Sequence, residues 1–208
     1  MSAKTKLMTA LFVAFALWGV MFSPWTASRI PFWPTMGTAA AVLYTMAFGF
    51  RRDWRDVLHF TPRYVLYGAL LAAFLWCVFW AGDKISALLF DFASCQVDSV
   101  YTLKEGASPW GVGALLLLFI GPVEELFWRG YVQRTLGELY TPNRAALFAV
   151  ALYTLVHLFS FNFMLLTAAA VLGVVWSTLF RVWPKALPAL IVSHALWDVS
   201  VFVLFPFR

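Results

Sequence analysis

Seven long apolar segments, separated by short charged or proline-containing stretches, constrain this chain more than any other feature of its sequence. Each comes close to the roughly 20 residues that an α-helix needs to cross the hydrocarbon core of a bilayer. Hydrophobic residues make up 62% of the chain and charged residues only 12%, unlike the composition of a soluble domain. We therefore predict an all-α, polytopic bundle of about seven membrane-spanning helices. The segments are Leu7–Phe22, Pro34–Phe50, Tyr64–Ala81, Trp110–Trp128, Arg144–Ser160, Phe163–Phe180 and Ala186–Phe205.

One polar stretch, residues 82–109, separates the third and fourth apolar segments. We predict that it lies outside the membrane and contains a short interfacial helix around Ile85–Phe92. No low-complexity linker and no internal repeat divides the chain. We therefore predict a single membrane domain, 1–208, in which residues 1–109 form the first spans and the outer loop. The motifs described below fall within residues 110–208.

The positions of lysine and arginine predict the orientation of the bundle. With the N-terminus in the cytoplasm, eleven of these residues fall on the cytoplasmic side and four on the other side, the bias typical of membrane proteins. The net charge of +5 therefore reflects topology. Because no basic stripe and no nucleic-acid-binding module is present, we predict no nucleic-acid partner. The eleven are Lys4, Lys6, Arg51, Arg52, Arg55, Arg63, Arg129, Arg134, Arg144, Arg181 and Lys185, and the four are Arg29, Lys84, Lys104 and Arg208.

A few ionisable residues lie inside or at the edge of apolar segments. Glu124 and Glu125 directly follow an apolar run, and His157 lies within the next one. His194 and Asp198 lie within the last segment. A charged side chain at mid-bilayer costs roughly 2.5–3.5 kcal/mol, so such groups are expected to face one another or a water-filled cavity. The cluster is therefore a candidate functional site inside the membrane.

Helical spacing indicates how these residues meet. Glu125 and Arg129 are four residues apart, so they share a helix face and can form an ion pair. The same spacing places His194 and Asp198 on one face. Pro122, just before the two acids, is expected to kink its helix or to begin a new one.

The predicted span boundaries also suggest how deep the cluster lies. Glu124 falls near the cytoplasmic end of Trp110–Trp128, whereas His157 lies farther from that end of its own segment. The two depths agree only if a helix end is displaced by a turn or if Pro122 lifts the acids. We expect the site to open toward the cytoplasmic half of the bilayer.

Three motifs in order along the chain resemble those of the CPBP intramembrane proteases, the CAAX protease and bacteriocin-processing family. Glu124–Arg129 has the form EExxxR. Tyr153–His157 fits FxxxH with tyrosine in place of phenylalanine, and His194–Asp198 fits the aspartate form of HxxxN or HxxxD. The resemblance covers about Val112–Val201 and implies an intramembrane peptide hydrolase. The first 110 residues carry no motif of this family.

The resemblance also implies roles for the residues. Glu124 and His157 would activate a water molecule for attack on a scissile carbonyl, and a buried carboxylate is a suitable base for this step. His194 and Asp198 would stabilise the oxyanion or orient its partners. An asparagine amide can donate a hydrogen bond, but an ionised aspartate cannot, so Asp198 either orients His194 or is protonated.

The remaining motif residues, Glu125 and Arg129, would brace the site.

Two histidines and two or three carboxylates can also hold zinc with water in an open position. The chain lacks HExxH, the usual helical pattern of zinc proteases. We favour a metal-free, glutamate-type mechanism without a cofactor, and zinc stays as the alternative.

We thus predict an endopeptidase that cleaves a membrane-associated peptide or protein. Its length and compact loops point to the cytoplasmic membrane of a bacterium. Two alternatives remain: a non-proteolytic immunity or scaffold protein with the same fold, and an ion or proton transporter. Buried acids and histidines also mark ion paths, but no inverted repeat or pair of broken helices is evident. The substrate class and the oligomeric state stay open.

Overall fold

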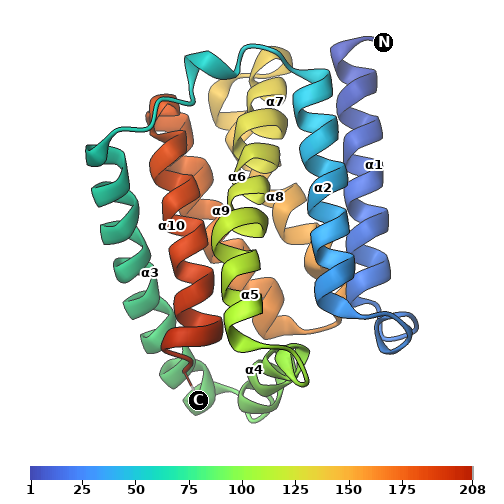
Figure 1. Cartoon of the computed structure of the whole chain (residues 1–208), viewed down its shortest axis with the longest axis vertical. Coiled ribbons are helices and arrows are strands. Elements are labelled where there is room, and N and C mark those ends of the chain that lie inside the picture. The colour runs from blue at the N-terminus through green and yellow to red at the C-terminus, as the bar shows by residue number, and fades with distance from the viewer. Residues whose placement is uncertain (208) are drawn as a thin grey trace.

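The computed structural model describes residues 1–207, and within them the chain is a bundle of helices without a β-strand (Figure 1). Six helical runs are long and apolar enough to cross a membrane, which confirms the predicted all-α, polytopic fold. The predicted span Pro34–Phe50 forms a helix of 19 residues beside α1, but this helix is not one of the six. The helices are α1 (Ala3–Phe22), α2 (Phe32–Phe50), α3 (Pro62–Leu89), α4 (Ala93–Tyr101), α5 (Pro109–Leu115), α6 (Gly121–Glu125), α7 (Arg134–Leu139), α8 (Pro142–Leu155), α9 (Phe163–Val182) and α10 (Leu187–Val199).

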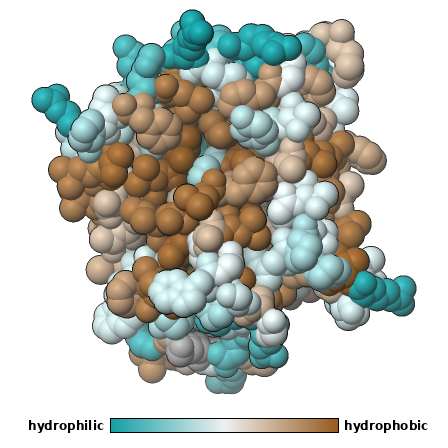
Figure 2. Space-filling view, in the orientation of Figure 1, coloured by the Kyte–Doolittle hydropathy of each residue, from teal (hydrophilic) through white to brown (hydrophobic). Residues whose placement is uncertain are grey.

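The surface carries the pattern of a membrane protein. Figure 2 shows hydrophobic residues across the middle of one face and hydrophilic residues gathered toward its upper and lower ends. Large apolar side chains such as Phe12, Phe74 and Leu118 are exposed around the bundle. Lipid would cover such a band, because the hydrocarbon core is as apolar as these side chains.

Short polar signals set where several helices begin. The side chains of Ser108 and Asn162 accept hydrogen bonds from backbone amides of the first turns of α5 and α9. Thr61 does the same for α3. These are N-caps, which satisfy amide groups that the helix itself leaves without an acceptor. Pro62 and Pro109 follow two of these caps, at a position where the missing N–H costs nothing.

Helix α3 is longer than predicted, and the predicted interfacial helix around Ile85–Phe92 is wrong. The span expected to end at Ala81 continues to Leu89, and the separate short helix is α4. Asp83 does not mark a loop, because only 7% of it is exposed and it lines an internal cavity. A polar side chain can thus stay within a helix when it has an ion-pair partner, here Lys84 at 3.1 Å.

The helix that carries the two acids is also longer than predicted. Instead of ending at Trp128, the run continues from α5 through α7 and spans 31 residues, Pro109–Leu139. It passes Pro122 without ending. Two stretches of wider π-helical turns, Leu116–Ile120 and Leu126–Gln133, flank the short helix α6. Wider turns accommodate a proline, whose nitrogen cannot donate a helical hydrogen bond.

This extension corrects the predicted position of Arg129 and the predicted relative depth of Glu124 and His157. Arg129, expected in a cytoplasmic loop, is completely buried within the helix. Glu124 lies 15 residues before Leu139, and His157 lies 15 residues after Pro142, which begins the next helix. The two side chains therefore lie at similar depth, and the mismatch expected from the predicted boundaries disappears.

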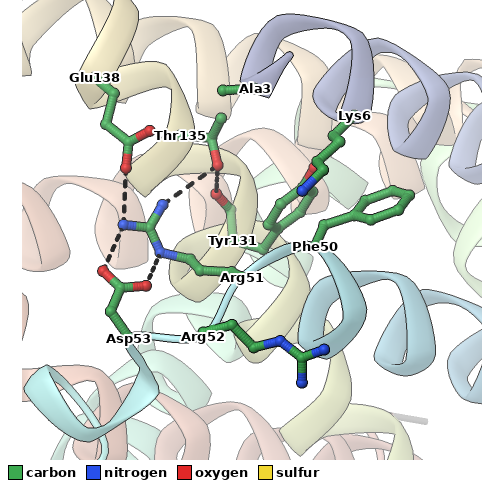
Figure 3. A pocket seen from close by; sticks show the side chains of 9 residues that line it. All are labelled: Ala3, Lys6, Phe50, Arg51, Arg52, Asp53, Tyr131, Thr135 and Glu138. Carbon is green, nitrogen blue, oxygen red and sulfur yellow. Dashed lines mark hydrogen bonds and ion pairs between the residues drawn. The ribbon is translucent and has the colours of Figure 1, made fainter. Parts of the chain in front are cut away.

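Ion pairs hold the far end of this long helix to the loop after α2 (Figure 3). The Arg51 guanidinium contacts Asp53 at 2.7 Å and Glu138 at 2.9 Å, and Arg134 reaches the same aspartate at 2.7 Å. Burial alone would raise the pKa of Asp53, but the Arg51 hydrogen bond and the charges of both arginines outweigh burial and lower it. Several charges in a network fix a helix end better than one isolated surface pair.

Candidate active site

The site forms where the long helix packs against α10. A Cβ added to Gly121 would come within 2.8 Å of the Ala195 Cα atom, so only a glycine permits this approach. One turn after this contact, Glu125 Oε1 lies 2.9 Å from His194 Nδ1. The close packing of two backbones thus brings residues 69 positions apart into direct contact.

Three buried side chains form a continuous polar chain. Glu125 Oε1 accepts hydrogen bonds from Arg129 Nη1 at 2.8 Å and from His194 Nδ1 at 2.9 Å. The guanidinium also lies 4.6 Å from the ring centroid of Tyr153 and 5.4 Å from that of Trp176, within range of cation–π attraction. The predicted pair of Glu125 and Arg129 is present. The motif spacing did not predict that the same carboxylate would orient His194.

The partners of His194 differ from those that spacing suggested. Its Nε2 atom lies 3.6 Å from Asp198 Oδ2, which is too long for a hydrogen bond. The imidazole instead stacks on Trp176, with ring centroids 4.1 Å apart and an angle of 22° between the planes. Trp176 was not recognised in the sequence, because a tryptophan in an apolar helix gives no sign of whether it faces lipid or a buried site.

His157 comes from the turn that ends α8. Its Nδ1 atom donates to the Tyr153 carbonyl at 2.9 Å, because a carbonyl can only accept. In the neutral ring this leaves the lone pair on Nε2. The rings of Trp18 and Phe22 from α1 pack beside the imidazole, with centroids 6.4 and 5.8 Å away. Helix α1 therefore helps to position this histidine, although it carries no motif.

One cavity of about 390 Å³ collects the remaining site residues. Glu124, His157, His194 and Asp198 all line it. Glu125 and Arg129 are both completely buried and are not among its lining residues. The six predicted residues therefore converge, but four face the cavity and two lie behind them.

The cavity extends toward the end of the bundle opposite the N-terminus. Beyond the four ionisable residues, its walls come from the last turns of α3, from α4 and from the first half of α9. Figure 1 places α4 at the opposite end from the N-terminus. An N-terminus in the cytoplasm and a site opening toward the cytoplasm therefore cannot both hold (Figure 1).

The arrangement of donors does not fit the zinc alternative. Within residues 1–207, no group of three His, Cys, Asp or Glu side chains is placed to hold a metal ion. Glu125 already accepts two hydrogen bonds, and His194 uses Nδ1 for one of them. No step of the chemistry below is therefore routed through a metal.

Comparison with known proteins finds one protein-family model that matches the part of the chain carrying the motifs. Residues 106–200 match the family model described as type II CAAX prenyl endopeptidase Rce1-like. No curated protein and no solved structure matches the chain. The match contains all three motifs and confirms the resemblance found from them.

Proposed function

We propose that this multi-pass membrane protein is an intramembrane endopeptidase, because residues 106–200 match the family model described as type II CAAX prenyl endopeptidase Rce1-like. Glu124 and His157 would activate the water molecule that attacks the substrate. The observation that carries this proposal is their shared position on one largely apolar cavity. An acid and a histidine facing the same small space can bind one water between them.

The hydrogen bond of His157 supports its role as an acceptor. Because Nδ1 is committed to the Tyr153 carbonyl, the Nε2 lone pair of the neutral ring is available. Glu124 is 6% exposed, and among residues 1–207 its carboxylate has no hydrogen-bond partner that would keep it from a bound water. One of these groups takes a proton from the water as its oxygen attacks the scissile carbonyl carbon. That proton then passes to the amide nitrogen as the C–N bond breaks.

His194 is the proposed partner of the oxyanion. Its Nδ1–H is held by Glu125, so only Nε2 can point to the reacting group. Nε2 donates when the ring is protonated, and the carboxylates of Glu125 and Asp198 flank that positive charge at 2.9 and 3.6 Å. Asp198 would then act by balancing charge, since an ionised carboxylate cannot donate to an oxyanion. Arg129 would hold Glu125 in place.

The test compares membrane peptides from cells that carry the wild-type protein, Glu124→Gln or His157→Gln, measured by mass spectrometry. Each substitution should abolish cleavage products, with a loss of about 10²–10⁴-fold for removal of a general base. The matched control is Glu105→Gln, which changes an exposed acid outside the cavity. Normal processing by both site variants, at normal protein levels, would overturn the proposal and favour an immunity or scaffold role.

Treatment with a zinc chelator separates the two mechanisms. We expect cleavage in detergent-solubilised membranes to continue after dialysis against the chelator, because the donor arrangement does not fit a metal. Loss of cleavage that zinc restores would contradict the glutamate-type mechanism and leave the protease activity itself intact.

A further inference from the structure

We infer that substrates enter this site from the non-cytoplasmic side of the membrane. The preferred substrate would be a polypeptide with an apolar segment presented on that side, rather than a tail exposed in the cytoplasm. This inference rests on the proposed protease function. Three independent features carry it: where the cavity leads, what closes its other end, and where the basic residues lie.

The cavity runs toward the end of the bundle opposite the N-terminus (Figure 1). Ser86 near the end of α3, Val97 on α4 and Met164 at the start of α9 all line it. The loop between α1 and α2 also reaches this end, and Phe32 and Trp33 from the start of α2 complete the wall. The N-terminus lies at the opposite end (Figure 1).

Buried aromatic packing closes the path toward the N-terminal end. Phe127 and Trp128, one turn beyond the two acids, are completely buried, and Tyr131 is 2% exposed. The second cavity, of about 380 Å³, lies beyond this layer and is lined by Arg51, Tyr131 and neighbouring residues, without any of the four site residues (Figure 3). A substrate arriving from the N-terminal end would have to displace this core, and close-packed interiors resist such displacement.

The basic residues place the N-terminal end in the cytoplasm. With Arg129 removed from the count because it is buried, ten lysines and arginines remain near the helix ends and loops on the N-terminal side. Among residues 1–207, three lie at the other end, namely Arg29, Lys84 and Lys104. Such an excess marks the cytoplasmic side. The mouth of the cavity therefore faces away from the cytoplasm.

The walls of the cavity indicate an apolar substrate segment. Its rim carries Phe90 and Phe163, and Phe79 lies farther in. Helix α4 closes the rim, because the Gln96 side chain accepts from the Met164 amide at 3.0 Å and the Gln96 carbonyl accepts from the Asn162 side chain at 2.7 Å. A substrate segment thus passes apolar walls of α3 and α9 before it meets the ionisable groups.

The first arm of the test measures orientation without requiring activity. Cys95 is an exposed thiol on α4, the helix at the end of the bundle opposite the N-terminus (Figure 1), and Cys77→Ser leaves it as the single thiol. A membrane-impermeant maleimide should label Cys95 in intact cells. The matched control carries Arg52→Cys with both native thiols changed to serine, and it should be labelled only in inverted vesicles. The reverse pattern would overturn the inference and leave the protease proposal standing.

The second arm measures whether this mouth is the substrate route. Ser86→Cys in the thiol-free protein places a reactive group on the cavity wall. Modification by a bulky impermeant maleimide from outside should block cleavage, whereas the same treatment of the Cys95 protein, whose thiol is not among the lining residues, should block it far less. Unchanged cleavage after complete modification of residue 86 would contradict the route. Absence of cleavage by the wild-type protein would instead contradict the proposed function.

Discussion

Loss of the Arg129 charge is expected to be among the most damaging changes to the stability of this protein. Arg129→Met keeps most of the side-chain volume but leaves Glu125 without its ion-pair partner. Both side chains are 0% exposed, and their charged atoms are 2.8 Å apart. Breaking such a pair by removing one member typically costs about 3–5 kcal/mol, because a buried charge is left uncompensated.

A second single variant and the double variant distinguish an uncompensated buried charge from simple loss of packing. Glu125→Gln removes the other charge, and its amide oxygen can still accept from His194 Nδ1. The double variant buries no unpaired charge, so we expect its free energy of unfolding to lie within about 1 kcal/mol of the wild type. Each single variant should be far less stable than the double variant.

Unfolding can be followed by circular dichroism in mild detergent as a denaturing detergent is added. The control is Lys185→Met, which removes an exposed charge outside the cavity. That change should alter the free energy of unfolding by no more than about 0.5 kcal/mol, as is usual for an exposed surface residue. If Arg129→Met proves as mild as Lys185→Met, or if the double variant is the least stable of all, the reasoning about a buried charge is refuted.

Two further changes test packing and charge. Gly121→Ala should abolish cleavage and destabilise the bundle, because its Cβ would press on the Ala195 backbone. The control is Gly137→Ala, whose Cβ would have no atom within 4 Å. This control should leave cleavage intact and add about 0.5–1 kcal/mol of stability. Cleavage by the Gly121 variant at the wild-type rate would contradict the close approach. Because two arginines lower the pKa of Asp53, its contribution to stability is present above its ordinary value of 3.8 and is lost as the pH falls below it. Asp53→Asn should therefore flatten the acid side of a plot of stability against pH, and an unchanged plot would count against the network.

Much of the site could be predicted because its members obey helical spacing within single segments. Glu125 and Arg129 are four residues apart and do form the expected ion pair. The acids and both histidines stood out because ionisable residues are rare in apolar segments. The partners of these residues could not be predicted in the same way. Trp176 looks like any lipid-facing tryptophan in the sequence, yet it stacks on His194.

The boundaries of two helices were wrong for a related reason. A charged or polar residue after an apolar run predicts a helix end, since an unpaired charge does not remain in the membrane. Asp83 and Arg129 remain within their helices because the bundle encloses them and each has an ion-pair partner, Lys84 and Glu125 respectively. Their burial depends on residues from other helices, and no local pattern reports it.

The sequence by itself determined the all-α membrane fold and the set of ionisable residues that converge, because hydropathy and helical periodicity are local properties of the chain. Only the tertiary structure decided which carboxylate holds His194, which nitrogen of His157 is left to accept a proton, and toward which end the cavity leads. Each of these depends on how closely two helices approach and at what rotation. Those quantities are set by packing between segments far apart in the chain, such as Gly121 against Ala195.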